Sequence, residues 1–389
     1  MRRFHMISNK TTWLIGLVVG IVTVSSTLGW SSTQGDGRVI ETVAGAGLAG
    51  YSGDGGSAVN AQIREATGLA VDADGNVYFA DTNNHIIRRI DRRGIITTVA
   101  GTPTQSGFAG EGGPATAAKL ATPTDVAVAP DGSLYIADNG NHVVRRIDRA
   151  TGVINTVAGT PNVANFTGDG GLATAATLRS PSSVAVDRLG NLYIADSFNY
   201  RIRRVDAVTR VITTIAGSGA RSVNTNDTGD GGSALLAKFR DVKDIVITSV
   251  GDILVADFSN NRVRRISPDG IITTIAGNGV FNVTGPEQLG DGSVATEAVV
   301  RWPSGLTLDG LGNLYIAENG SHRIRRVNAE GRISTVAGSG DPRSPGCAGD
   351  GGPAAEAQLN GPTSVVTDAA GNVYLSDSRC FRIRVVRNQ

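Results

Sequence analysis

The stretch GNVYFADTNNHIIRRID, residues 75–91, decides the fold because closely similar stretches return five more times along the chain. An acidic residue holds the same place in every copy, and successive copies lie 57 to 61 residues apart. Self-similarity at a nearly constant period is the sequence signature of a repeat architecture. The other copies are GSLYIADNGNHVVRRID (132–148), GNLYIADSFNYRIRRVD (190–206), GDILVADFSNNRVRRIS (251–267), GNLYIAENGSHRIRRVN (312–328) and GNVYLSDSRCFRIRVVR (371–387).

Each period predicts four short strands. Within a copy, Gly-Asn or a similar pair opens an aliphatic and aromatic run, a polar turn follows, and a second β-branched run closes the pattern, which is typical of a hairpin. A further apolar run precedes the hairpin, as in residues 68–72, and another follows it, as in residues 95–101. Four short strands with glycine-rich turns and no long helix are the content of one propeller blade.

The two ends of the repeat array complement each other. Residues 39–45, VIETVAG, form a fourth-strand pattern with no first three strands before it, and the last copy reaches Gln389 without a fourth strand. An N-terminal strand that completes the last blade would leave no exposed sheet edge. We therefore expect an all-β fold: a six-bladed β-propeller of four-stranded blades over residues 38–389, closed by the N-terminal strand.

The Gly-Asn, aromatic, Asp, Asn and Ile-Arg arrangement of these copies resembles the NHL-repeat family of six-bladed β-propellers. Bacterial members with GDGG loops and the propeller module of teneurins look most similar. The resemblance covers about residues 38–389. It implies the fold, whereas the activity must be argued from a site, because one fold hosts many functions.

The N-terminal residues 1–29 are predicted to be a signal peptide. Three basic residues precede the apolar core WLIGLVVGIVTV (13–24), and small residues follow it. Cleavage after Gly29 would leave residues 30–37 as a linker and place the protein in a secreted, periplasmic or cell-surface location. The alternative is an uncleaved membrane anchor, although the sixteen apolar residues to Leu28 fall short of the about 20 that a span needs.

The charge balance argues against a nucleic-acid ligand. The chain has 36 basic and 35 acidic residues, and without the three basic residues of segment 1–29 the balance is 33 to 35, a net charge of −2. Binding to phosphates requires a basic footprint. The recurring Arg-Arg pairs are predicted to be structural, with guanidinium groups paired to the repeated acid. We expect a monomer.

The connections between blades contain a glycine-rich turn with one acid, followed by an alanine-rich stretch that predicts a single short helix. Calcium requires six to eight oxygen ligands, so one carboxylate per loop predicts no metal site. The acids are instead expected to cap the short helix or to order the turn. They are Asp54, Glu111, Asp169, Asp230, Asp291 and Asp350.

Neither a catalytic residue nor a cofactor is identified. His85, His142 and His322 share one repeat position, but equivalent positions lie apart around a ring, unlike the zinc histidines near the axis of amidating lyases. Lactonases, another six-bladed class, hold an axial calcium with inward acids. The carboxylates of Glu65, Asp125, Asp241 and Asp244 keep a metal-dependent lactonase or lyase open as the alternative function.

Residues that lead into the first strands differ between blades, and there we expect a ligand-binding rim around the channel mouth, on the face of the long loops. Mixed charges and one indole suit a protein, a peptide or a polar saccharide. Arg301 and Trp302 are the expected anchors. The rim residues are Arg64, Glu65, Asp125, Arg179, Arg240, Asp241, Lys243, Asp244, Arg301 and Trp302.

The two cysteines of the chain, Cys347 and Cys380, are expected to form a disulfide. Cys347 lies in the connection into the last blade, and Cys380 lies in its turn between the second and third strands. Both features emerge on one face of the same blade, and the predicted compartment is oxidising. Two free thiols are the alternative.

Overall fold

The computed structural model describes residues 37–223, 229–282, 289–340 and 345–388. The predicted signal peptide, its cleavage site and almost all of the linker therefore lie outside the described residues. Within these described ranges, no helix has both the length and the apolar character that a membrane crossing requires.

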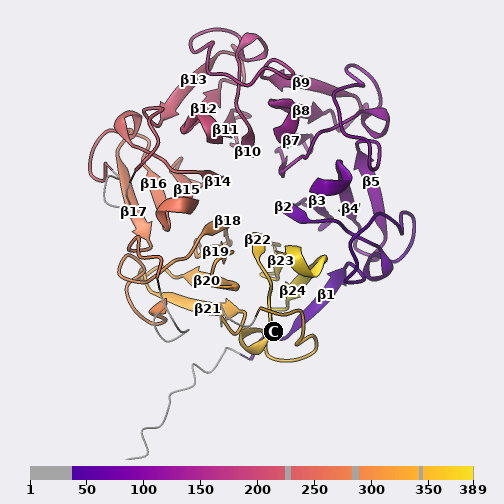
Figure 1. The fold of residues 1–389 in the computed structure, drawn as a ribbon, viewed down its shortest axis with the longest axis vertical. Coiled ribbons are helices and arrows are strands. Elements are labelled where there is room, and N and C mark those ends of the chain that lie inside the picture. Colours follow the sequence, from indigo (N-terminus) through magenta and orange to yellow (C-terminus); the bar gives the residue numbers. More distant parts are fainter. Residues whose placement is uncertain (1–36, 224–228, 283–288, 341–344, 389) are drawn as a thin grey trace, which may run out of the picture. The chain divides into compact units, whose positions relative to one another are not determined.

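Six antiparallel sheets of four strands surround a common axis, as predicted (Figure 1). Each sheet follows the order first, second, third and fourth strand from the axis outward. In chain order the first five blades are β2–β5 (Ala66–Val71, Val77–Asp81, Ile86–Ile90, Ile96–Ala100), β6–β9 (Asp125–Val128, Leu134–Asp138, Val143–Ile147, Ile154–Ala158), β10–β13 (Pro181–Val186, Leu192–Asp196, Arg201–Val205, Ile212–Ala216), β14–β17 (Val242–Ile247, Ile253–Asp257, Arg262–Ile266, Ile272–Ala276) and β18–β21 (Pro303–Leu308, Leu314–Glu318, Arg323–Val327, Ile333–Ala337).

The sixth blade combines both ends of the array, which confirms the predicted ring closure. It contains β22 (Pro362–Thr367), β23 (Val373–Asp377) and β24 (Arg382–Val386), and β1 (Ile40–Ala44) supplies the fourth strand. β1 pairs antiparallel with β24 from Ile40 opposite Val386 to Ala44 opposite Ile383.

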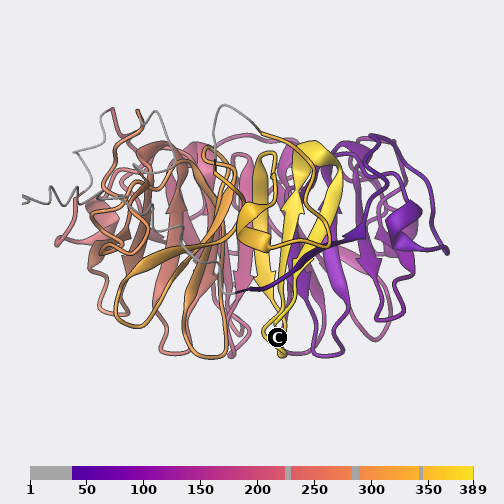
Figure 2. The ribbon, with the colours of Figure 1, turned by 90° about the horizontal axis from the view of Figure 1, so that it is seen from below.

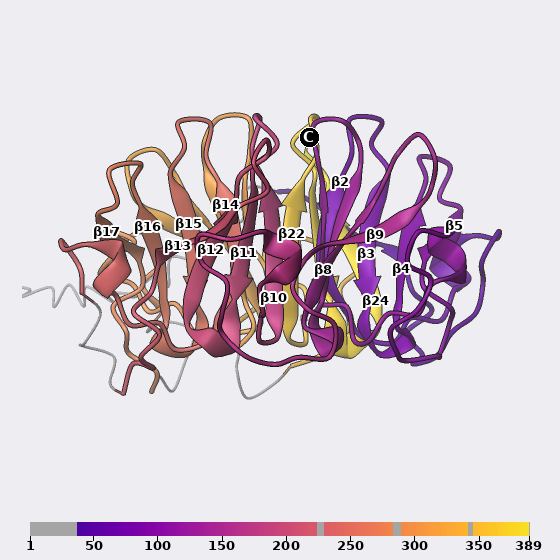
Figure 3. The same ribbon diagram turned by 90° about the horizontal axis from the view of Figure 1, so that it is seen from above.

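The ring has two different faces. Turns from first to second and from third to fourth strands form one face, which we call the short-turn face; it is the lower edge in Figure 2 and the upper edge in Figure 3. Connections from fourth to first strands and turns between second and third strands form the other, the long-loop face. The described chain enters β1 from the short-turn face, because Ile40 pairs with the end of β24.

The short helices are single 3₁₀ turns of three residues. Five lie in the connections and five between second and third strands, among the residues that the structure describes. Those in the connections have no side-chain capping hydrogen bond. The capping role expected of the loop acids was therefore wrong. The connection turns are η1 (Ala58–Asn60), η3 (Ala115–Ala117), η5 (Ala173–Ala175), η7 (Ala234–Leu236) and η10 (Ala354–Glu356).

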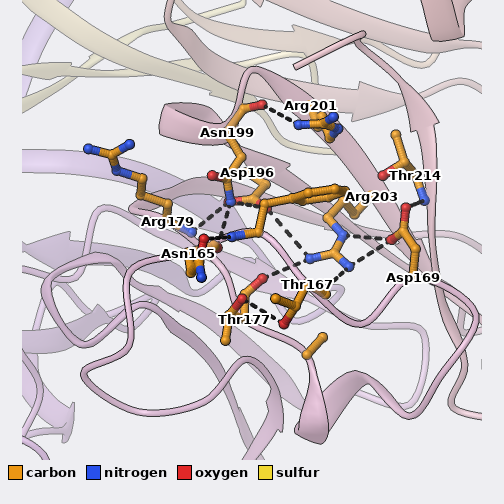
Figure 4. A network of polar contacts seen from close by, with 12 residues as sticks. Asn165, Thr167, Asp169, Thr177, Arg179, Asp196, Asn199, Arg201, Arg203 and Thr214 are labelled. Carbon is orange, nitrogen blue, oxygen red and sulfur yellow. Dashed lines mark hydrogen bonds and ion pairs between the residues drawn. The ribbon is translucent and has the colours of Figure 1, made fainter. Parts of the chain in front are cut away.

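The loop acids instead bind a buried arginine, shown for the third blade in Figure 4. Arg203 on β12 is fully buried and lies 2.7 Å from a carboxylate oxygen of Asp169 in the connection. It lies 3.7 Å from Asp196 at the end of β11, and it donates to the backbone carbonyl groups of Thr167 and Thr177. One guanidinium group thus joins two strands and the connection that leads into the blade.

The same pairing holds in all six blades and confirms the structural role predicted for the arginines for the first member of each recurring pair. Each arginine side chain is 0% exposed and meets one loop acid and one strand acid. The sets are Arg88 with Asp54 and Asp81, Arg145 with Glu111 and Asp138, Arg203 with Asp169 and Asp196, Arg264 with Asp230 and Asp257, Arg325 with Asp291 and Glu318, and Arg384 with Asp350 and Asp377.

Neighbouring blades are joined by apolar clusters and by a polar link at the rim. Six buried clusters each combine side chains of two adjacent blades. At four junctions, the residue after the second-to-third turn accepts the backbone N–H of the residue that leads into the next blade. The pairs are His85 Nδ1 with Thr122 (3.1 Å), His142 Nδ1 with Ser180 (3.2 Å), Asn261 Oδ1 with Trp302 (3.1 Å) and His322 Nδ1 with Gly361 (2.9 Å).

Cys347 and Cys380 form a disulfide, as predicted, with their Cα atoms 5.6 Å apart. The bond ties the connection into the sixth blade to the turn between β23 and β24. It closes this part of the long-loop face covalently and restricts the unfolded chain.

We expect Arg203→Met to lower the free energy of unfolding by about 3–5 kcal/mol, because it leaves the buried carboxylate of Asp196 without its cation. The matched control is Arg204→Met on the same strand. Arg204 is 31% exposed and pairs with Asp206, so we expect a change below about 1 kcal/mol. Urea denaturation of both variants measures the difference, and equal losses would contradict the role assigned to Arg203.

The three histidines predict a loss of stability in acid. Burial lowers the pKa of His85, His142 and His322 below the usual value, and nearby arginines lower it further. The unfolded chain therefore takes up protons first, so this contribution is present above pH about 6.5 and is lost as pH falls toward the folded pKa. A protonated Nδ1 also cannot accept the N–H group.

Replacing all three histidines with Asn preserves an acceptor, as Asn261 shows at the equivalent position. The variant and the natural chain share all carboxyl groups. The difference between their melting temperatures therefore reports the effect of histidine protonation alone. We expect the variant to gain relative stability between pH about 6.5 and 5. A pH-independent difference would contradict the assignment.

Candidate functional site

A cavity of about 300 Å³ lies at the channel mouth on the long-loop face. Most of its walls are hydroxyl and amide side chains from the first strands and from the second-to-third turns. Lys243 and Phe258 add a cation and an aromatic ring, and Glu65 adds a carboxylate. The other side chains in the wall are Thr67, Thr82, Thr124, Asp125, Asn139, Ser182, Asp244, Ser304, Asn319, Thr363 and Ser364.

The backbone at this rim has an unusual conformation in every blade. In five blades the residue directly before the first strand has a positive φ, and in the second blade it is Thr122, three residues before β6; five of the six are not glycine. Such residues are uncommon, and they persist only where the surrounding structure imposes the conformation. They are Glu65 (70°), Thr122 (43°), Ser180 (50°), Asp241 (97°), Trp302 (50°) and Gly361 (64°).

Below the mouth, Asp125 and Asp244 lie on first strands that have one blade between them. Asp125 accepts the backbone N–H of Val184 at 2.9 Å, and Asp244 accepts that of Leu306 at 2.7 Å. The hydroxyl group of Ser183, on the blade between, donates to Asp244 at 2.7 Å. Burial raises the pKa of both carboxyl groups. The pKa of Asp125 is raised well above its usual value, because repulsion by Asp244 adds to the effect of burial. The pKa of Asp244 is raised to about 6.

These axial carboxylates do not fit an axial divalent cation. Both oxygens of each group already accept hydrogen bonds, and only two carboxylates meet there. Across the described ranges, no group of three or more His, Cys, Asp or Glu side chains is placed to hold a metal ion. Calcium needs several converging oxygen ligands, so this donor set supplies no such site.

The structure brings four of the predicted rim residues into the cavity wall. Glu65, Asp125, Lys243 and Asp244 line it, and Lys243 also pairs with Asp241 at 3.1 Å. The remaining predicted residues lie outside this wall. They are Arg64, Arg179, Arg240, Asp241, Arg301 and Trp302.

A row of three aromatic rings, Phe258, Trp302 and Phe281, leads from the cavity to Arg301. Phe258, in the turn after β15, stacks on Trp302 with ring centroids 5.7 Å apart, and the tilted Phe281 ring has its centroid 5.2 Å from that of Trp302. The Lys243 ammonium lies 5.3 Å from the Phe258 ring, and the Arg301 guanidinium 5.1 Å from Phe281. We call these five residues the aromatic column.

Phe258 was missed by the sequence reasoning. It occupies the first position of the turn between second and third strands, where the other blades carry Thr82, Asn139, Ser197, Asn319 and Ser378. An aromatic residue at a position that is otherwise small and polar was a visible signal. Its meaning became clear only when the fold brought it next to Lys243 and Trp302.

Known proteins share this repeat. The family model of the teneurin NHL domain matches residues 40–105 and 100–166. Human teneurin-4 is 31% identical over 346 residues, which cover 82% of this chain but 12% of that protein. Mouse teneurin-1 is 34% identical over 235 residues, covering 56% of this chain and 8% of that protein. The chain thus spans a small part of the length of these relatives.

Solved structures share the fold at low sequence identity. An auxiliary nutrient binding protein from Bacteroides ovatus superposes with a TM-score of 0.64 at 16% identity, over 91% of this chain and 77% of that one. A protein of the same description from Bacteroides thetaiotaomicron gives 0.63 at 17% identity, over 90% and 76%. With six registered repeats, a closed ring and the teneurin matches, the chain belongs to the NHL-repeat family of six-bladed β-propellers.

Proposed function

We propose that this chain is an exported, monomeric binding module that takes a polar peptide or saccharide segment at the mouth of the propeller channel. The observation that carries the proposal is the mouth cavity of about 300 Å³. A concave site with a few convergent polar groups is the usual form of a ligand pocket.

The cavity wall favours a ligand with many hydrogen-bonding groups. Hydroxyl groups and side-chain amides both donate and accept, so they match peptide groups or sugar hydroxyls better than an apolar body. Glu65 and Lys243 come from the first and fourth blades, which are opposite in a ring of six. A ligand therefore meets a negative and a positive group on opposite sides.

The aromatic column extends the proposed site outward from the cavity. Phe281 is 39% exposed, so the outer end of the column is open to a ligand. Flat or sugar-like groups pack on such rings, and guanidinium groups bind carboxylates. Arg301 and Trp302 thus remain the proposed anchors, and Phe258 joins them.

Three observations support the biological setting. The disulfide is typical of an oxidising compartment, in agreement with a secreted, periplasmic or cell-surface protein. Two fold neighbours are described as auxiliary nutrient binding proteins, which agrees with a binding role. The net charge makes duplex nucleic acid a poor ligand. A metal-dependent lactonase or lyase stays the alternative function, because a streptogramin B lyase and a gluconolactonase share the fold as well.

We expect the double change Arg301→Ala and Trp302→Ala to weaken binding by more than about 2 kcal/mol, because anchors of this kind dominate interface energies. The probes are a panel of short peptides and a panel of oligosaccharides, screened by saturation-transfer NMR. Calorimetry then measures the affinity of each hit for the natural chain and for the variant.

The matched control is Arg93→Ala on the short-turn face, where the side chain is 83% exposed. It should leave the affinity unchanged. If hits bind the folded double variant as tightly as the natural chain, the anchors are wrong; if Phe258→Ala and Lys243→Ala also leave the affinity unchanged, the mouth itself is not the site.

A further inference from the structure

The segments around the channel mouth are more positive than the rest of the chain. They are the residues that lead into the first strands and the turns between second and third strands. Together these segments contain five arginines and two acids, a net charge of +3, whereas the chain after residue 29 has a net charge of −2. We call the five residues the rim arginines; they are Arg64, Arg179, Arg240, Arg301 and Arg379.

The acids at the mouth already have partners. Glu65 accepts a hydrogen bond from the neighbouring turn, and Asp241 pairs with Lys243 at 3.1 Å. Asp125 and Asp244 accept hydrogen bonds from neighbouring blades below the mouth. If these two acids and Lys243 are counted with the mouth, its net charge is still +2.

The rim arginines have no such partners. In the described part of the chain, none of the five guanidinium groups forms a salt bridge or donates a hydrogen bond. Arg64, Arg179 and Arg379 are exposed. Arg301 packs on Phe281, and its Nε and Nη1 atoms are buried without an acceptor. The positive charge of the mouth is therefore not neutralised by the described chain.

The fold does not require arginine at these positions. Four rim arginines directly follow the last buried apolar residue of a connection, and the second and sixth blades carry Ala121 and Asn360 there. What the fold uses at this position is the backbone N–H group, which donates to the strand acid, as Arg64 does to Asp81 and Asn360 to Asp377. The arginine side chains are thus free for a ligand.

The rim arginines also affect the histidines at the blade junctions. Burial lowers the pKa of all three histidines, and the positive charge of nearby rim arginines lowers each pKa further. An anion bound beside these arginines would have the opposite effect. The pairs are His85 with Arg64, His142 with Arg179, and His322 with Arg379 and Arg301.

We propose that the ligand at the mouth is an acidic saccharide, a chain of uronic acids whose carboxylates bind the rim arginines and whose ring faces pack on the aromatic column. This inference rests on the proposed function, because it names the ligand class for the same mouth. Guanidinium groups bind carboxylates through paired, charge-assisted hydrogen bonds, which are stronger than neutral ones.

A uronic acid combines the three chemistries that the mouth presents. Each unit has an apolar ring face for the aromatic rings, hydroxyl groups for the hydroxyl and amide wall, and one carboxylate for the arginines. A neutral sugar would leave the arginines unpaired. An acidic peptide carries its carboxylates on flexible stems, so its binding immobilises more rotatable bonds than that of a sugar, where the carboxylate is fixed on the ring.

The first experiment compares short fragments of polygalacturonate with the same fragments after methyl esterification, which removes the charge and keeps the sugar. Fragments of alginate, treated in the same way, and an oligoglutamate peptide are measured beside them. Calorimetry on the natural chain gives each affinity. We expect the charged fragments to bind about tenfold or more tightly than the esterified ones. This difference should decrease as salt is added, because salt screens exposed charges.

A variant of three exposed rim arginines tests their contribution. Arg64→Ala, Arg179→Ala and Arg379→Ser each introduce a residue that another blade carries at the same position, so the fold tolerates the change. We expect the affinity for the charged fragments to fall about tenfold or more. The affinity for the esterified fragments should stay the same.

The matched control removes three exposed arginines from the short-turn face, Arg92→Ala, Arg93→Ala and Arg188→Ala. It changes the net charge equally and should alter the affinity by less than about twofold, because these charges lie far from the mouth. NMR titration of His85 gives a second readout. The charged fragments should raise its pKa by offsetting the charge of Arg64, and the esterified fragments should not.

Four results would overturn the inference. They are no binding of charged fragments of either polymer, equal binding of charged and esterified fragments, tighter binding of oligoglutamate than of the uronates, and equal affinity of the charged fragments for the rim variant and its control. In the second and third cases the proposed function stands, because a saccharide or a peptide still occupies the mouth. The proposed function fails separately, when no probe of any class loses affinity in the variants at Arg301, Trp302, Phe258 and Lys243.

Discussion

The fold depends on one fully buried arginine in each blade. Burying a guanidinium group destabilises the folded state unless its charge is paired and its N–H groups find hydrogen-bond acceptors. In the third blade, Arg203 meets the loop acid Asp169 and the strand acid Asp196 and donates to two backbone carbonyl groups. The planar fork of arginine allows these contacts at once, which a lysine ammonium would not. The ion pairs of the buried arginine with a loop acid and a strand acid recur in all six blades and hold the connections against them.

The same network sets the geometry of the proposed binding rim. Asp196 also accepts the backbone N–H of Arg179 at 2.7 Å, directly before the first strand of its blade. The equivalent bond in the first blade joins Asp81 to the N–H of Arg64 at 2.8 Å. Repeated polar groups thus fix the rim backbone, while the side chains attached to it are free to differ. A ligand site can change here without a change in the fold.

The repeat pattern predicted the features that recur in each blade, but contacts between residues far apart in the sequence were missed. The period of the repeat predicted the blades, and the missing strands at its two ends predicted the closure of β1 on β24. The disulfide was predicted because both cysteines belong to one blade and the expected compartment is oxidising. The partner of Asp169 could not be found this way, because Arg203 lies 34 residues away and no local pattern joins them. The aromatic column was hidden for the same reason: Phe258, Phe281 and Trp302 meet only through the tertiary fold.

First strands of neighbouring blades pack closely around the axis. A Cβ atom on Gly68 would lie 2.2 Å from a carboxylate oxygen of Asp125, and one on Gly305 would lie 2.6 Å from the Cα atom of Ser364. At these two junctions the first strands approach so closely that glycine is required on one side. Between other first strands, Asp125 accepts the backbone N–H of Val184 and Ser364 accepts that of Leu69. The carboxylates of Asp125 and Asp244 at the axis therefore hold neighbouring blades together through these hydrogen bonds. In the proposed function, recognition falls to the side chains above them, where the rim backbone is fixed and the residues vary.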